Sequence, residues 1–299
     1  MRYSASPASE STYALGEGPV WDAPRGRLLW VDILNNTVHE GSLTESGPIA
    51  TKRSWTFDDT VGAVAVAADG ALLVAERHTL TLLNNDQSRE AIARVLPPDR
   101  ESRLNDGAVD PAGRFLVGSL AQDERTGEEI LVRLDDAGVT VVDADLDLSN
   151  GLAWSPAGDL FYSIDTLRNL VRVREYDPAT GAMGERRDLV TIADGGHPDG
   201  MCADADGNLW IAVWGGARVE CRSPEGALLG VVEVAAPNTS SVAFAGPDLD
   251  TLVITTAARG VPRERRAAYP DSGKLFTVKV GARGLPTAPW VKPACAPSS

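Results

Sequence analysis

Among the polar residues that stand directly before a glycine in this sequence are Glu17, Asp106, Asn150 and Asp199. They offer three carboxylates and one amide, and their oxygen atoms are hard donors. Such donors suit Ca²⁺, Mg²⁺ or Mn²⁺ and also accept Zn²⁺. Three carboxylates held close together would repel one another unless a cation lay between them. If the fold gathers these residues, they predict a site for one divalent cation.

The same glycines mark an internal repeat. The repeat positions are Gly18, Gly62, Gly107, Gly151, Gly200 and, in the sixth place, Ser241. The spacings between them are 44, 45, 44, 49 and 41 residues. In each repeat an apolar run leads to a turn such as PAG or ADG, and a second apolar run follows, as in "SNGLAWSPAGDLFYSIDT".

These repeats predict an all-β fold. Six repeats of about 45 residues, each supplying about four short strands, are typical of a six-bladed β-propeller with four-stranded blades around a central channel. We expect one domain over residues 1–299, with the first and last blades sharing strands so that the ring has no free edge. A solenoid of β-turns is the structural alternative, although it would favour shorter and more regular repeats.

A propeller would bring the polar residues together. The innermost strand of each blade lines the channel, so one repeat position falls on one ring near a channel mouth. In the position before the glycine this ring contains Glu17, Val61, Asp106, Asn150, Asp199 and Ser240. The alternative is that Asp and Asn before Gly are ordinary turn residues. That alternative explains Asn150 or Asp199 singly, but it explains Glu17 poorly.

Composition restricts the partners and the compartment. The formal net charge of −14 argues against nucleic acid and anionic membranes, which both require basic surfaces. No run approaches the ~18 apolar residues of a membrane span, and the first residues do not resemble a signal peptide. Cys202, Cys221 and Cys295 are too widely spaced for a disulfide framework. We expect a cytoplasmic protein that is a monomer or a weak oligomer.

Other chemistries find little support. No G-x-S-x-G motif is present, which argues against a serine hydrolase. The three histidines, His39, His78 and His197, are far apart, so a multi-histidine zinc site is not expected. His197 either lines the channel mouth or lies on a solvated loop. Trp214, just past an apolar run, either reaches the mouth or packs in the core.

Four motifs carry a family resemblance: "GEGPVWD", "RLNDGAVDPAGRF", "SNGLAWSP" and "PDGMCADADGNLWIA". Together they resemble the SMP-30/gluconolactonase family, also called the regucalcin family, across essentially the whole chain. The resemblance implies a six-bladed propeller that binds one divalent cation and hydrolyses sugar lactones. It further implies that Glu17, Asn150 and Asp199 are the protein ligands of the metal ion.

The resemblance also implies substrate contacts. Arg103 and Asn105, in "SRLNDG", are expected to face the substrate, and Asp123 stands where vertebrate members have a glutamate. Arg103 offers forked donors for hydroxyls or a developing carboxylate, and Asn105 can both donate and accept. The alternative for Arg103 is a surface ion pair with Glu101.

These residue types suit the hydrolysis of an aldonolactone to the aldonic acid. A lactone is a cyclic ester, so hydrolysis needs a polarised carbonyl and a water nucleophile, which a divalent cation can provide. Asp199 is the candidate general base. We keep two alternatives: a related propeller hydrolase acting on other esters or organophosphates, and a non-enzymatic propeller that binds a divalent cation or a protein. Arg103 and Asn105 favour the lactonase, because a bare ion site needs no groups that recognise hydroxyls.

Overall fold

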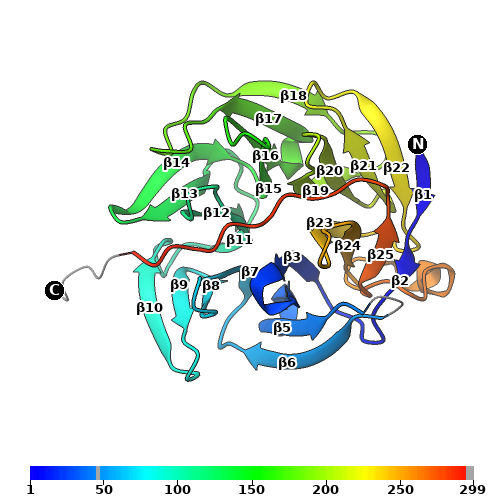
Figure 1. Ribbon diagram of the computed structural model, residues 1–299, viewed down its shortest axis with the longest axis horizontal. Helices are drawn as coiled ribbons and strands as arrows, with labels where there is room; N and C mark the ends of the chain where they lie inside the picture. The colour runs from blue at the N-terminus through cyan, green and yellow to red at the C-terminus, as the bar shows by residue number, and fades with distance from the viewer. Residues whose placement is uncertain (45–47, 294–299) are drawn as a thin grey trace.

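The computed structural model describes residues 1–44 and 48–293, and six β-sheets form a closed ring around a central channel (Figure 1). Each repeat in the sequence folds into one sheet whose strands follow one another in chain order from the axis outwards. The ring confirms the six-bladed β-propeller and excludes the solenoid.

The first three blades contain β3 (Gly16–Asp22), β4 (Arg27–Asp32), β5 (Thr37–Ser42) and β6 (Ala50–Thr56); β7 (Val61–Val66), β8 (Leu72–Glu76), β9 (Thr79–Leu83) and β10 (Arg89–Arg94); and β11 (Ser102–Val109), β12 (Phe115–Ala121), β13 (Glu129–Asp135) and β14 (Gly138–Leu146). The fourth to sixth blades contain β15 (Ser149–Trp154), β16 (Leu160–Asp165), β17 (Leu170–Glu175) and β18 (Arg187–Thr191); β19 (His197–Ala203), β20 (Leu209–Trp214), β21 (Arg218–Arg222) and β22 (Leu228–Glu233); and β23 (Thr239–Ala245), β24 (Thr251–Thr256) and β25 (Phe276–Lys279). Among the described residues, four short 3₁₀ helices connect strands: η1 (Ala23–Arg25), η2 (Ile33–Asn35), η3 (Thr166–Arg168) and η4 (Arg263–Ala268).

The N-terminal strands close the ring. β2 (Ser6–Pro7) pairs antiparallel with β25 and so supplies the outer strand of the sixth blade. β1 (Arg2–Ser4) adds a fifth strand to the fifth blade by pairing parallel with β22. The first segment of the chain therefore holds its last blade in place, as the sequence analysis predicted.

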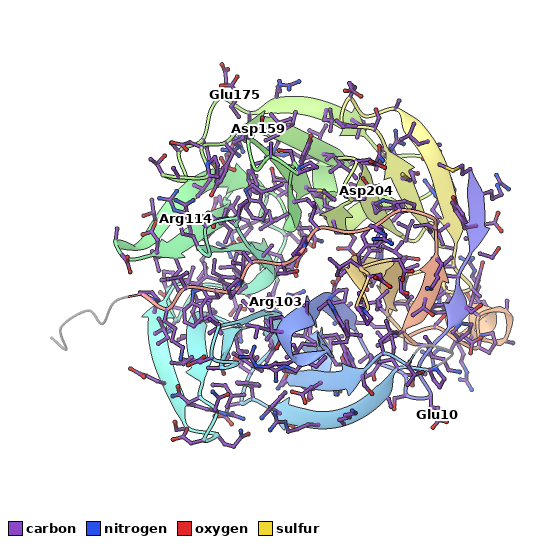
Figure 2. All side chains as sticks on the ribbon, viewed as in Figure 1. Glu10, Arg103, Arg114, Asp159, Glu175 and Asp204 are labelled. Carbon is purple, nitrogen blue, oxygen red and sulfur yellow. The ribbon has the colours of Figure 1, made fainter. Side chains whose placement is uncertain are left out.

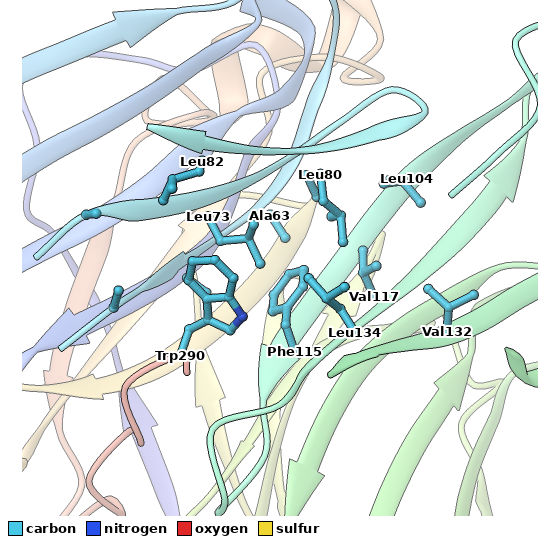
Figure 3. Packing of buried hydrophobic residues seen from close by; sticks show 14 of the residues in the cluster. Ala63, Leu73, Leu80, Leu82, Leu104, Phe115, Val117, Val132, Leu134 and Trp290 are labelled. Atoms are coloured by element: carbon cyan, nitrogen blue, oxygen red, sulfur yellow. The ribbon is translucent and has the colours of Figure 1, made fainter. Parts of the chain in front are cut away.

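Burial falls from the axis to the rim. All six residues of the inner strand β7 are buried, whereas the outer strand β6 exposes every residue except Trp55. β7 is covered on both faces by neighbouring blades, so its sequence VGAVAV reads as a continuous apolar run rather than as an alternating pattern. The hydrophobic clusters lie between blades, as where Leu73 and Leu80 pack near Phe115 and Val117 (Figure 3).

A C-terminal strap, residues 280–293, follows β25 and crosses one face of the ring (Figure 1). Gly284 bridges to Asp204 in the fifth blade, and Trp290 bridges to Ala67 in the second. The Trp290 side chain is buried in the cluster between the second and third blades (Figure 3). The strap lies over the channel end at which the inner strands finish, where residues 285–289 line a cavity of about 560 Å³.

Each inner strand is irregular at the repeat glycine. The pairing register shifts between Glu17/Val20, Val61/Ala63, Leu104/Gly107, Asn150/Leu152, Pro198/Met201 and Thr239/Ser241. Such bulges change the direction of a side chain next to functional sites. A Cβ on Gly151 would lie 2.6 Å from the carbonyl oxygen of Asp199, and one on Gly62 would lie 2.5 Å from that of Asn105. Glycine is therefore required where neighbouring inner strands converge on the axis.

Cys202 and Cys221 are free thiols, and Cys295 lies outside the described residues. Within residues 1–44 and 48–293 the structure contains no helix that is long and apolar enough to cross a bilayer.

Candidate active site at the channel mouth

A cavity of about 580 Å³ opens at the channel end where the inner strands begin. Because the first two strands of each blade are antiparallel, the start of the first and the end of the second reach this same mouth. The cavity is lined by Leu15, Glu17, Ile33, Leu34, Arg103, Asn105, Leu120, Gln122, Leu148, Asn150, Thr166, Leu167, His197, Asp199, Trp214, Arg259 and Gly260. The lining thus combines an apolar wall with a few polar groups, as small-molecule sites do.

The three residues expected to bind metal lie together in this cavity. Glu17, Asn150 and Asp199 are all buried and come from the first, fourth and fifth blades. Asn150 Nδ2 donates to Asp199 Oδ1 and, over 3.1 Å, to Thr166 Oγ1. Thr166 Oγ1 donates in turn to the carbonyl oxygen of Pro198 over 2.8 Å. These contacts fix the amide of Asn150 between two blades.

The other three ring positions behave differently. Asp106 lines the cavity on the strap side, and its Oδ1 accepts the N–H of Gly107 over 2.8 Å. Val61 is packed in the core between the first and second blades. Ser240 Oγ donates to the carbonyl oxygen of Gly16 over 2.6 Å and so ties the sixth blade to the first. Only half of the ring therefore reaches the mouth.

Burial of the carboxylates makes this region electrostatically unfavourable on its own. Burial, with the charges of Asp199 and Asp106, raises the pKa of Glu17 well above its ordinary value. The pKa of Asp199 is raised by burial and by Asp106. Burial raises the pKa of Asp106 to about 6. The site thus concentrates negative charge that a cation would neutralise.

The donor set fits a hard divalent cation. In the described part of the chain no three His, Cys, Asp or Glu side chains are grouped to hold a metal ion, and the amide of Asn150 is the further oxygen donor that lies beside Glu17 and Asp199. The amide uses Nδ2 for both of its hydrogen bonds, and among the described residues no donor contacts Oδ1. Glu17, Asn150 and Asp199 can therefore offer three oxygen ligands, a number that leaves room for water or substrate.

Arg103 stands in the same cavity and is not the surface ion pair considered above. Its side chain is buried, whereas Glu101 is exposed and pairs with Arg77 over 3.5 Å. Figure 2 shows Arg103 near the centre of the ring. Arg103 Nη1 donates to Asn105 Oδ1 over 2.7 Å and to the carbonyl oxygen of Leu104 over 3.1 Å. Burial lowers the pKa of Arg103 to about 10, so the guanidinium stays charged at neutral pH.

Asp123 is not brought to the cavity. Its side chain is 41% exposed and forms an ion pair with Arg125 over 2.7 Å. The preceding residue, Gln122, lines the cavity instead. The carboxylate is drawn away from the mouth by this ion pair, so the structure gives Asp123 no contact with the other candidate residues.

The cavity is also lined by two residues for which the sequence left alternatives open and by two others that carry no motif. His197 and Trp214 both line the cavity, and His197 Nδ1 lies 2.7 Å from Asn169 Oδ1. Thr166 and Arg259 carry no motif, but each follows the second strand of its blade and lines the cavity. A usable signal existed: in an antiparallel blade the residues after the second strand reach the same mouth as those before the first.

A family model described as "SMP-30/Gluconolactonase/LRE-like region" matches residues 15–258. The chain belongs to this family. Among relatives in the SMP-30/gluconolactonase family, regucalcin of Xenopus laevis is 36% identical over 289 residues, covering 93% of this chain and 95% of that protein. The pentonolactonase of Haloferax volcanii is 35% identical over 288 residues, which cover 93% of this chain and 94% of that protein. The crystal structure of regucalcin from Agrobacterium tumefaciens is described as that of a calcium-binding protein. It superposes on this chain with a TM-score of 0.90 at 26% sequence identity, and the match covers 98% of this chain and 99% of that chain.

Proposed function

We propose that the protein is a divalent-metal-dependent sugar lactonase, which hydrolyses an aldonolactone to the aldonic acid. The observation that carries the proposal is the convergence of two buried carboxylates, one amide and a buried arginine in one cavity. The pentonolactonase relative supports the same class of substrate. In the proposed site, Glu17, Asn150 and Asp199 bind the cation, and Arg103 contacts the sugar.

When bound, a divalent cation supplies Lewis-acid polarisation of the carbonyl and acidifies water. Asp199 is the proposed base. Its Oδ1 accepts a hydrogen bond from Asn150, and within the described residues no donor contacts its Oδ2. It takes a proton from water as the water oxygen bonds to the carbonyl carbon. The ring carbon–oxygen bond then breaks, and the ring oxygen receives the proton to become a hydroxyl.

Arg103 is proposed to hold the substrate. Its Nη1 is engaged by Asn105 and the backbone, which orients the remaining donors of the guanidinium. An arginine fork can bind sugar hydroxyls in the lactone and the carboxylate of the product. The apolar side chains of the lining limit water around the reacting atoms.

A second candidate function is a propeller that binds a cation without catalysis, and the relative described as a calcium-binding protein favours it. The test is the hydrolysis of glucono-1,5-lactone followed in a pH-stat, beside a simple aryl ester and an organophosphate, with and without EDTA. We expect the protein to hydrolyse the lactone and EDTA to abolish this activity. Mn²⁺, Zn²⁺, Mg²⁺ or Ca²⁺ should restore the activity to different degrees. Absence of lactone turnover with cation bound would favour the non-enzymatic candidate, and preference for either other substrate would favour a different hydrolase.

A further inference from the structure

A second guanidinium, that of Arg259, lines the same cavity as Arg103. Arg259 lies in the segment after β24, and its backbone is held on both sides. Its N–H donates to the carbonyl oxygen of Ala14 over 3.0 Å, and its carbonyl oxygen accepts Asn238 Nδ2 over 2.7 Å. The backbone of Arg259 is thus fixed between the first and sixth blades, while its side chain is exposed to solvent at the cavity.

Neither arginine of the cavity has a carboxylate partner in the part of the chain that the structure describes. The other buried arginine among the described residues, Arg174, does have one and pairs with Asp143. The chain contains 42 acidic and 28 basic residues other than histidine, so carboxylates are not scarce. Two guanidiniums that line one cavity without a direct ion pair are therefore free to bind a ligand that supplies negative charge.

The charges around the cavity support an anionic ligand. After burial, which lowers the pKa of Arg103, the charges of Glu17 and Asp199 raise this pKa and the charge of Arg259 lowers it, so both carboxylates and the second guanidinium lie within electrostatic reach of Arg103. The lining holds two arginines and two carboxylates, Glu17 and Asp199. If these carboxylates and the neighbouring Asp106 face a divalent cation as proposed above, their three negative charges do not offset the cation and both arginines, and one positive charge is left without a balance. An anion near Arg259 would supply it.

We infer that Arg259 binds an anionic group carried by the sugar lactone, so that the preferred substrate class is a lactone with a carboxylate or phosphate at the end away from the reacting carbonyl. This inference rests on the proposed function. Arg103 is buried beside the metal-binding residues, and Arg259 is exposed at the rim. A sugar whose carbonyl lies near Arg103 would therefore present its far end to Arg259. Arg259 is a specificity residue in this arrangement and takes no proton.

The test compares three lactones: neutral glucono-1,5-lactone, the carboxylate-bearing glucaro-1,4-lactone and 6-phospho-glucono-1,5-lactone. For each, kcat/KM is measured with the wild type, Arg259→Gln, Arg259→Lys and Arg263→Gln. Arg263 is the matched control, because it is exposed on the same segment and does not line the cavity. The wild type should prefer one of the charged lactones, and the better of the two identifies carboxylate or phosphate as the recognised group.

Arg259→Gln should lower the ratio of kcat/KM for the charged lactone to that for the neutral one by roughly tenfold to a hundredfold, the effect of one charge-assisted hydrogen bond. Arg259→Lys should recover part of the ratio, and Arg263→Gln should leave it unchanged. An equal ratio in the wild type and Arg259→Gln, or a wild type that prefers the neutral lactone, overturns the inference.

A binding measurement separates this inference from the proposed function. Calorimetry compares the open-chain glucarate with gluconate in the same metal-containing buffer, and neither compound needs to react. Glucarate should bind the wild type more tightly, and Arg259→Gln should remove most of the difference. Turnover of glucono-1,5-lactone without any effect of Arg259 on either readout would overturn only the anion subsite. Absence of turnover with every lactone would overturn the lactonase, whatever the binding shows.

Discussion

Arg103 Nη1 donates to Asn105 Oδ1 over 2.7 Å, and Asn105 Nδ2 donates to the carbonyl oxygen of Ser149 over 2.9 Å. Both ends of the Asn105 amide are therefore engaged within the protein. Asn105 links Arg103, on the third blade, to the backbone that leads into Asn150 on the fourth. We expect Asn105 to act chiefly by positioning Arg103.

This linkage predicts non-additive effects. Arg103→Ala should lower kcat/KM for glucono-1,5-lactone roughly tenfold to a few hundredfold, because it removes a charge-assisted hydrogen bond worth about 1.5–3 kcal/mol. Asn105→Ala should give a smaller loss, and the double variant should resemble Arg103→Ala alone. A double variant whose loss equals the product of the two single losses would show that the two residues act independently.

The hydroxyl contacts of Arg103 can be tested with a lactone that lacks hydroxyls, such as δ-valerolactone. Arg103→Ala should impair its hydrolysis less than that of glucono-1,5-lactone, because the contacts with sugar hydroxyls do not exist for it. Asp123→Asn is the matched control, since Asp123 lies outside the cavity lining. Equal losses on both lactones, accompanied by weaker metal binding in calorimetry, would assign Arg103 to the ion and not to the sugar.

The crowded carboxylates predict an unusual effect of Asp106→Asn on stability. With EDTA present, this variant should be more stable than the wild type at pH 7, by up to about 3 kcal/mol for a shift of about two units. The folded pKa of Asp106 is about 6, above its ordinary 3.8, so the native state binds more protons than the unfolded state between these values. Stability of the wild type should therefore fall as pH rises through this window.

The measurement for Asp106 is urea unfolding at pH 4 and pH 7. Near pH 4 the carboxyl is protonated in the folded protein, so the advantage of Asp106→Asn should largely disappear. Saturating divalent cation should reduce the advantage at pH 7, since the cation offsets the negative charge. A variant that is less stable than the wild type at pH 7 in EDTA would contradict the electrostatic account of the channel.

Gly151→Ala should disturb both stability and catalysis. The added Cβ would meet the Asp199 carbonyl oxygen at 2.6 Å and the Met201 nitrogen at 2.8 Å, so the strand that carries Asp199 must move. Overpacking of this kind costs typically about 1–3 kcal/mol. Gly184→Ala is the control, because its closest contact is a side-chain carbon at 3.2 Å. Thermal unfolding and kcat are measured for both; a Gly151→Ala protein with normal kcat would show that Asp199 tolerates the shift.

The repeat made much of this fold predictable. The near-regular spacing of the repeat positions can be read directly from the sequence. The six blades, their inner strands and the grouping of Glu17, Asn150 and Asp199 follow from this spacing. The closure by β2 was also predictable, because a propeller with an open edge would expose unpaired backbone groups.

Other features depend on contacts that no repeat encodes. Ring residues with the same place in the repeat do not all line the same cavity, so Asp106 could not be assigned to the strap side from its position in the repeat. The strap is held by Trp290, which lies after the last repeat. The direction of the Asp123 side chain is set by a local contact, its ion pair with Arg125. Arg259 has no motif and is distinguished by its place in the cavity lining.

We propose above that one cation, held by Glu17, Asn150 and Asp199, supports lactone hydrolysis. The most direct measurement is a titration of EDTA-treated, desalted protein with Mn²⁺, in which the initial rate of glucono-1,5-lactone hydrolysis is recorded at each addition. The rate should rise in proportion to added ion and level off at one ion per chain. Glu17→Gln, Asn150→Ala and Asp199→Asn should keep their β-sheet circular dichroism yet remain near the uncatalysed rate. Full turnover in the metal-free protein, or near-normal turnover in all three variants at saturating Mn²⁺, would contradict the account.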